Sequence, residues 1–291
     1  MLVHGIELGD EGKPTWIRFS MLRLMEHLLD PSGFQDRSLP TWARRFRSRR
    51  FYHDVSYFRT CFQKFNRAAD HVGRCRVAIQ RWTDREMRGD AKEVSVSDSD
   101  SDAWLAALTD LPIYLDLMLF YLRMQADAYA QLVPYLYENG GDIKRRSFRD
   151  QTVWFTRTRP HFDAEYALVL GENLGWFEAL AGKKPSGLRD VLVHHGGTYQ
   201  VGWTVPDEAA AFKLHASLLN STGYVEEDLL SALQTITTGW CAFLDAAWHH
   251  FVKKLSGVLA TMNVDEATKT RYAHCGGLEL SHFWVYPRAA G

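Results

Sequence analysis

The segment from about Ala103 to Tyr137 constrains the fold more than any other part of this chain. Apolar side chains recur in it at the three- and four-residue spacing that places them on one helical face. The members of this face are Leu105, Leu108, Leu115, Met118, Leu119, Leu122 and Leu132. A helix this apolar is typical of a bundle core, and we expect Pro112 and Pro134 to kink or divide it. Asn139-Gly140-Gly141 then ends it, as glycine commonly does.

Further segments show helical periodicity, and only one is extended. The helical segments are residues 14–29, residues 51–87 with a break expected at Gly73, residues 163–180 and residues 226–259. Residues 199–205 alternate and predict a short strand, whereas Pro206 is expected to start a short helix that carries Phe212, Leu214 and Leu218. Because helices predominate, we expect an all-α bundle of long antiparallel helices, with a short extended or hairpin segment after the glycines at 196–197.

A polar tract divides the sequence. Residues 93–102, EVSVSDSDSD, are rich in Ser and Asp and contain little that could pack, which predicts a flexible loop or linker. The end of the tract can cap the next helix, because Ser and Asp oxygens accept hydrogen bonds from first-turn amides. We therefore predict an N-terminal helical extension over residues 1–100 and a helical bundle with a C-terminal tail over residues 103–291.

The composition indicates a soluble globular protein. The chain has 291 residues, of which 46% are hydrophobic, and a formal net charge of -1. The cysteines lack any Cys-x-x-Cys spacing and read as reduced thiols: Cys61, Cys75, Cys241 and Cys275. With no secretory signal in the first residues, these features predict a cytoplasmic location. The stretch from Leu111 to Leu122 is too short to span a bilayer and contains Asp116, so we expect no membrane span.

A polar motif breaks the apolar pattern at residues 187–197, GLRDVLVHHGG. On a helix, Asp190 and His194 lie four residues apart and share a face, and Arg189 begins the same turn. A histidine that titrates near neutrality can move a proton at a ribose or leaving oxygen, and an arginine can hold charge that builds on a phosphate. This chemistry requires no metal. The alternative is structural: Arg189 and Asp190 pair at a helix start, and the histidines and glycines form its exit.

At these residues the sequence resembles the HEPN superfamily (higher eukaryote and prokaryote nucleotide-binding domains). These all-helical bundles are marked by Arg, a polar residue, three further residues and His, which here are Arg189, Asp190 and His194. In nuclease members the motif lies near the start of a late helix, and two protomers face each other to form one metal-independent RNA-cleaving site. The resemblance covers roughly residues 103–259 and implies a homodimeric endoribonuclease, with a role as a toxin or defence effector.

The resemblance also assigns roles to individual residues. Arg189 would stabilise the pentavalent phosphate, and His194 would transfer the proton at the 2′-hydroxyl or the 5′-oxygen. Asp190 would orient His194, with His195 as an alternative base. Some toxin members carry a tyrosine two residues after the histidine, which a partner enzyme modifies. Gly196 stands at that position here, which puts this form of control by a partner or antitoxin in doubt.

Basic residues ahead of the motif are the candidate RNA contacts after Arg189: Arg145, Arg146, Arg149, Arg157 and Arg159. Residues 41–52 interleave five arginines with aromatics. That run could grip phosphates, but we favour a solvated helix face paired with acidic residues elsewhere. A second hypothesis for the whole chain is a non-catalytic HEPN-like module that binds nucleic acid or a partner protein. A third is a purely structural helical protein.

No metal or other cofactor is expected. The neighbouring histidines of residues 248–251, WHHF, point to different sides of a helix and make a poor metal pair. His274, Cys275 and His282 match no standard zinc spacing. The sequence also lacks a glycine-rich phosphate loop and a Gly-x-Ser-x-Gly elbow, which argues against a nucleotide hydrolase or an α/β hydrolase.

Overall fold

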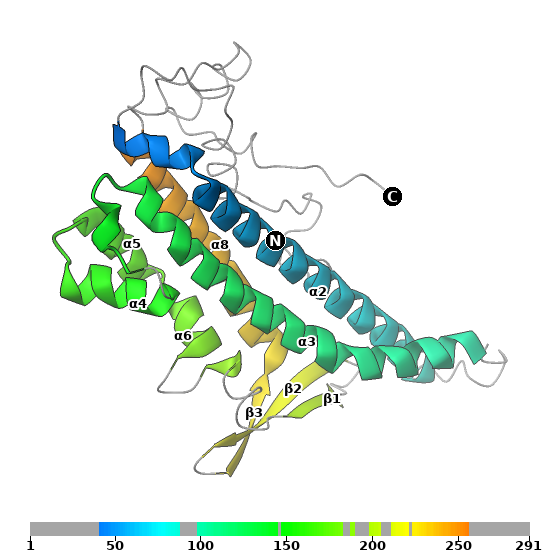
Figure 1. Ribbon diagram of the computed structural model, residues 1–291. Helices are drawn as coiled ribbons and strands as arrows, with labels where there is room; N and C mark the ends of the chain where they lie inside the picture. Colours follow the sequence, from blue (N-terminus) through cyan, green and yellow to red (C-terminus); the bar gives the residue numbers. More distant parts are fainter. Residues whose placement is uncertain are drawn as a thin grey trace.

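Long helices dominate the architecture. The computed structural model describes residues 41–87, 98–144, 147–182, 187–189, 198–204, 211–220 and 223–255. Its centre is an antiparallel pair, α2 (Arg49–Met87) and α3 (Asp98–Leu132), which run the length of the molecule (Figure 1). A third long helix, α8 (Leu229–Lys254), lies beside them. The predicted all-α bundle of long antiparallel helices is therefore confirmed.

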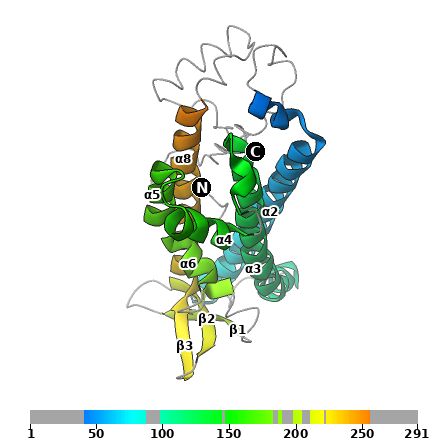
Figure 2. The same cartoon turned by 60° about the vertical axis from the view of Figure 1, so that its left-hand side comes forward.

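Short helical elements fill the space beside α3 and α8. Figure 2 shows α4, α5 and α6 on the side where these two long helices meet. The short elements are η2 (Thr41–Arg47), η4 (Val133–Leu136), η5 (Gly140–Asp142), α4 (Phe148–Val153), the π-helical η6 (Trp154–Thr158), α5 (Ala164–Glu172) and α6 (Gly175–Ala181). The segments expected to be helical at 14–29 and to form the C-terminal tail lie outside the described residues.

Several details of the helix predictions need correction. The segment expected to be helical over residues 163–180 is divided into α5 and α6. Helix α2 continues through Gly73, so the expected break is wrong; Gly73 is buried inside the continuous helix. Helix α3 accommodates Pro112 in its interior, whereas the division expected at Pro134 is present: the α-helix ends at Leu132, before the glycines at 140–141, and the 3-10 turn η4 follows. Helix α3 also begins at Asp98, so the end of the Ser and Asp tract is helical instead of a loop.

A small antiparallel sheet follows the motif segment. Strand β1 (Thr198–Thr204) pairs with β2 (Ala211–Asn220), which pairs with β3 (Gly223–Asp228). The strand expected at 199–205 is confirmed. The helix expected after Pro206 is wrong, because the residues that were to form its apolar face lie in β2. The register places Phe212 opposite Trp203 and Leu214 opposite Val201.

One hydrophobic core extends from η2 to α8. At its centre the ring of Tyr129 in α3 contacts Phe148, Trp240 and Phe243 from α4 and α8. Its buried hydroxyl shares a 2.8 Å hydrogen bond with the hydroxyl of Tyr166. This bond gives each of the two buried hydroxyls a partner inside the core. Helices α2 and α3 thus belong to the same packed unit as the later helices.

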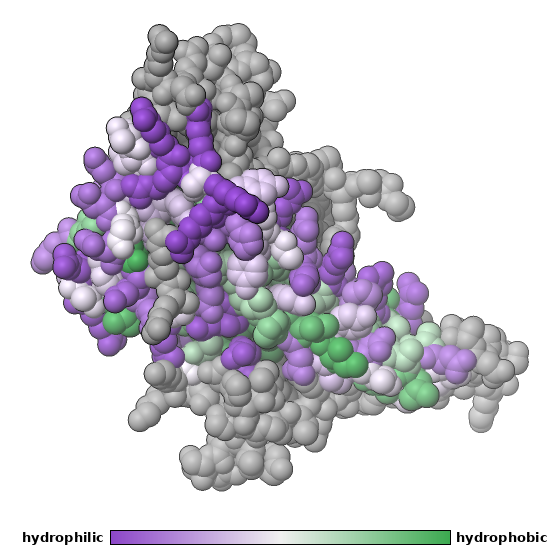
Figure 3. All heavy atoms as spheres, in the orientation of Figure 1, coloured by the Kyte–Doolittle hydropathy of each residue, from purple (hydrophilic) through white to green (hydrophobic). Residues whose placement is uncertain are grey.

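The outer face of α3 carries exposed apolar side chains, among them Leu105, Ile113 and Phe120. Figure 3 shows apolar surface gathered along this helix. Among the described residues, only the helical stretch Ser101–Leu136 is long and apolar enough to cross a membrane; an 18-residue window within it has a mean hydropathy of 1.5. Length and composition alone give this result, and the core helices of soluble proteins pass the same test.

Candidate functional site

The motif segment starts in close contact with α6. The amide of Gly187 donates a 2.9 Å hydrogen bond to the carbonyl of Gly182, just past the end of α6. A Cβ at Gly187 would collide with the backbone of Leu180 and Ala181, so only glycine fits there. Leu188 is buried, and Arg189 is half-buried in a helical conformation. The packing therefore fixes the position of the backbone from which the Arg189 side chain extends.

The other motif residues, Asp190, His194 and His195, lie outside the described residues. Their arrangement around Arg189 stays a prediction from the helical spacing.

The candidate RNA contacts ahead of the motif differ in exposure. Arg157 in η6 and Arg159 just after it are exposed, whereas Arg149 in α4 is half-buried. Arg145 and Arg146 lie outside the described residues. Exposed arginines in irregular or strained helical segments are available to a ligand, and π-helical turns are frequent at functional sites.

In the arginine-rich run of residues 41–52, one arginine is structural. The guanidinium of Arg45 donates to the carbonyls of Trp42 at 2.7 Å, Pro134 at 3.2 Å and Glu138 at 2.6 Å. It therefore ties η2 to η4 and to the loop after η4. All three of these acceptors are backbone carbonyls. The remaining arginines of the run are exposed: Arg44, Arg47, Arg49 and Arg50.

The most connected polar group in the described part of the chain is Asp163, the N-cap of α5. Its Oδ1 accepts a 2.9 Å bond from the Tyr166 amide. Its Oδ2 accepts from the Tyr137 hydroxyl at 2.9 Å, from Nε2 of His250 at 2.9 Å and from the Lys254 ammonium at 3.1 Å. These bonds join α5 to the end of η4 and to the last turns of α8. None of these side chains was among the site residues predicted from the sequence.

The environment of this cluster shifts the pKa values of Asp163 and Tyr137. Burial alone would raise the pKa of Asp163, but hydrogen bonds from His250, the Tyr166 amide and Tyr137 outweigh it and hold this pKa well below its usual range. Burial, followed by the charge of Asp163, raises the pKa of Tyr137 far above its usual value. The cluster thus holds an ionised carboxylate against a neutral tyrosine at every physiological pH.

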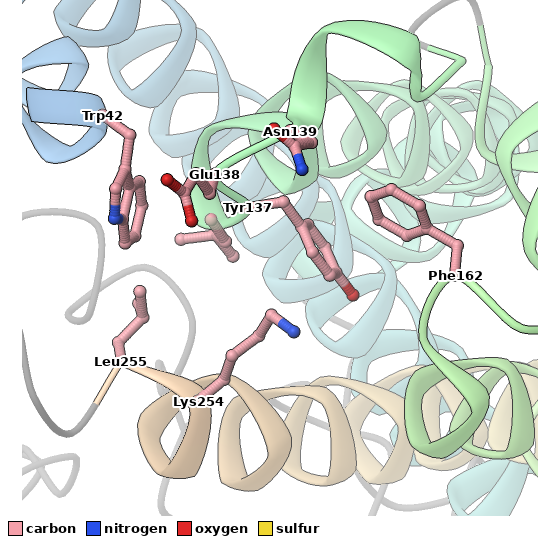
Figure 4. A pocket seen from close by; sticks show the side chains of 8 residues that line it. Trp42, Tyr137, Glu138, Asn139, Phe162, Lys254 and Leu255 are labelled. Carbon is pink, nitrogen blue, oxygen red and sulfur yellow. The ribbon is translucent and has the colours of Figure 1, made fainter.

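A pocket of about 420 Å³ borders the cluster between η2, η4 and the end of α8. Figure 4 shows the Lys254 side chain reaching from α8 toward Tyr137, with Trp42 on the far side of the pocket. The Lys254 ammonium lies 4.5 Å from the centre of the Tyr137 ring. This cation–π contact and the bond to Asp163 hold the ammonium at the pocket wall.

The geometry of the cluster is that of a structural anchor. Side chains of Asp163 and His250 are only 6% and 7% exposed, and the second ring nitrogen of His250 lies 3.7 Å from a carboxylate oxygen of Glu165. Both nitrogens of His250 therefore face carboxylates, and neither is presented to a substrate in the pocket. Among the described residues, no group of His, Cys, Asp and Glu is arranged to hold a metal ion.

Part of this cluster has a signal in the sequence. Asp163 precedes an apolar helix, which is the usual place for an N-cap. Its pairing with His250 joins residues 87 positions apart. A single sequence does not reveal such a contact.

Comparison with known proteins identifies no relative: no family model, no curated protein and no solved structure is similar enough to this chain to match it.

Proposed function

We propose that this chain is a metal-independent endoribonuclease of the HEPN type, active as a homodimer. The observation that carries the proposal is the anchoring of the motif in an all-helical bundle. The Gly187 turn packs on α6 so closely that no side chain fits, and Arg189 follows in a helical conformation. A rigidly held backbone at a functional residue is one requirement of a catalytic site, and the packing of Gly187 meets it for Arg189.

The proposed reaction uses side chains of the motif. The 2′-hydroxyl oxygen of the RNA attacks the neighbouring phosphorus, and the bond from phosphorus to the 5′-oxygen breaks. The products are a 2′,3′-cyclic phosphate and a free 5′-hydroxyl. His194 moves the proton at the attacking or the leaving oxygen, Arg189 stabilises the charge on the phosphate, Asp190 orients His194, and His195 is the alternative base.

The same proposal assigns RNA contacts to the basic residues ahead of the motif: Arg145, Arg146, Arg149, Arg157 and Arg159. Exposure of Arg157 and Arg159 supports this role. By the family resemblance we further propose a biological role as a toxin or defence effector, held in check by an antitoxin or another regulatory protein.

The proposal is tested by cleavage of a mixed RNA pool in EDTA. Arg189→Ala and His194→Ala are expected to reduce the rate by about 100-fold or more, as loss of a general acid or base does. Lys253→Ala is the matched control, because Lys253 is an exposed cation that pairs with the likewise exposed carboxylate of Glu165. Circular dichroism spectra and thermal unfolding establish that each variant is folded.

Two outcomes would redirect the proposal. Full activity in a folded His194→Ala protein contradicts it, unless the His194→Ala, His195→Ala double variant is inactive and so identifies His195 as the base. Absence of cleavage by every preparation, with RNA binding retained, favours the non-catalytic HEPN-like module.

A further inference from the structure

The outward face of α2 is strongly and uniformly basic. Every exposed Asp, Glu, Lys or Arg side chain of residues 41–82 is a cation: Arg44, Arg47, Arg49, Arg50, Arg59, Lys64, Arg67, Arg74 and Arg81. The acidic residues of this stretch, Asp54 and Asp70, are half-buried, and Asp70 lies one helical turn before Arg74, whose charge acts on it. Asp54 accepts a 2.8 Å hydrogen bond from the Tyr135 hydroxyl, which directs it toward η4. The chain as a whole has a net charge of -1, so this positive surface is local.

Helical geometry puts four of these arginines on one line. Arg67, Arg74 and Arg81 follow at seven-residue intervals, which are steps of about 10.5 Å with a rotation of only about 20°. Arg49 falls on the same side, so the line extends over about 48 Å. The opposite face of the helix is buried against the bundle, for example at Phe58 and Val72. The arginines therefore point directly away from the protein.

From this arrangement we infer that the outward face of α2 is a docking track for the phosphate backbone of RNA. A row of exposed arginines along one face neutralises phosphates without reading bases, which is how proteins bind nucleic acid independently of sequence. The inference rests on the proposed function for the identity of the polymer. It adds a second RNA-binding surface, which the motif and its neighbouring arginines do not include.

A membrane surface is the competing occupant, and the composition of the face argues against it. Binding to a lipid surface needs large apolar side chains among the cations, so that they insert between headgroups. On the described part of α2 the exposed large apolar residues are only Tyr52 and Val77. The apolar surface of the hairpin lies on α3, and each of the two helices buries the face turned toward the other. The arginines and the apolar side chains therefore face in opposite directions.

The position of the track makes its effect depend on RNA length. Both views place α3 between α2 and α6, where the motif segment is anchored (Figure 1; Figure 2). An RNA of a few nucleotides that fills the motif site does not reach α2. A long RNA bound at the motif can continue around the bundle or lie along α2 of the partner copy.

The test measures binding of a fluorescein-labelled single-stranded RNA of about 40 nucleotides by fluorescence anisotropy between 50 and 200 mM salt, the range over which phosphate contacts dominate. All proteins carry His194→Ala, so that cleavage does not interfere. The Arg67→Gln, Arg74→Gln, Arg81→Gln variant removes three positive charges from exposed positions. The Arg67→Lys, Arg74→Lys, Arg81→Lys variant is the matched control, because it keeps the charges on the same face.

The Gln variant is expected to bind at least about tenfold more weakly, and its slope of log K against log [salt] to fall by about 2, since each lost phosphate contact contributes about 0.7 on a single strand. The Lys variant should keep the slope. Equal slopes and affinities for the Gln variant and its parent overturn the inference. It is also overturned if the Gln substitutions abolish binding to vesicles with about 30% phosphatidylserine and leave RNA binding unchanged.

The inference and the proposed function fail in different ways. If α2 binds RNA in this assay and the protein without the His194→Ala change cuts none, the track stands and the nuclease proposal fails. If the protein with an intact His194 cuts both a six-nucleotide and a 40-nucleotide RNA, and the Gln substitutions leave the KM for each RNA unchanged, the nuclease proposal stands and the track fails. If both the nuclease and the track are correct, the Gln substitutions raise the KM for the 40-nucleotide RNA and leave the KM for the six-nucleotide RNA unchanged.

Discussion

Replacing Asp163 is expected to cost more stability than any other single charge change in the described part of the chain. Its carboxylate accepts four hydrogen bonds, one from the α5 amide of Tyr166 and three from Tyr137, His250 and Lys254. Removing one partner of a buried ionic pair costs about 3–5 kcal/mol, and removing an N-cap costs about 1 kcal/mol. Lys254 is 35% exposed and its ammonium can be solvated by water, which favours the lower end of the range for the ionic pair. We therefore expect Asp163→Ala to lower the free energy of unfolding by about 4 kcal/mol.

The comparison with Asp163→Asn separates the contributions. Asparagine keeps an oxygen for the Tyr166 amide but loses the charge that faces His250 and Lys254, so we expect about 3 kcal/mol, with the cap accounting for the difference. Glu165→Gln is the matched control, because Glu165 lies on the same helix near the same histidine but is 67% exposed. Exposed ion pairs contribute little, so this change should cost below about 1 kcal/mol.

The assay is urea unfolding followed by circular dichroism, at pH 7 and at several lower pH values. The folded pKa of Asp163 lies below its unfolded value. Its contribution is therefore fully present above the unfolded pKa, at about pH 4, and is lost as the pH falls toward the folded pKa. The difference in free energy of unfolding between the parent protein and Asp163→Asn should become smaller as the pH falls below about 4. The reasoning is refuted if this difference is no larger than the one caused by Glu165→Gln, or if it grows as the pH falls.

Two further changes test the core. Tyr166→Phe leaves the buried Tyr129 hydroxyl without the partner it has at 2.8 Å and should lower the free energy of unfolding by about 1–3 kcal/mol. In denaturant unfolding, the Tyr129→Phe, Tyr166→Phe double variant should lose less stability than the sum of the two single changes. Gly239→Ala puts a methyl group 2.5 Å from Cβ of Trp176 and should lower stability by about 1–2 kcal/mol despite the better helix propensity of alanine. Gly171→Ala, with open space around it, should instead raise the thermal midpoint; a stabilising Gly239→Ala would show that α6 and α8 are not in close contact.

Long-range periodicity was sufficient to predict the helical fold. The apolar spacing over residues 103–137 identified α3, because a helix of that length has few alternatives in a soluble domain. The short elements were harder. The four-residue step from Leu214 to Leu218 fits a helix. However, Phe212, Leu214 and Leu218 are separated by even numbers of residues, so they would also share one face of a strand. Pairing with β1 decides between the two, and that pairing is a tertiary contact.

The site was predictable only where it is local in sequence. The spacing of Arg189, Asp190 and His194 can be read from the chain, as can the N-cap role of Asp163. The partners of Asp163 come from η4 and from α8, and only the folded bundle brings them together. The structural role of Arg45 was also hidden, because its acceptors are backbone carbonyls of η4 and of the loop after it, about 90 residues away.

The most direct test of the central claim is end-group analysis of RNA treated with the protein in EDTA. Parallel reactions contain the parent protein and the Arg189→Ala, His194→Ala double variant, both shown to be folded. The account predicts fragments with 2′,3′-cyclic phosphate and 5′-hydroxyl ends from the parent protein, and none from the double variant. Identical fragments from both proteins, or fragments with 5′-phosphate ends, would contradict it.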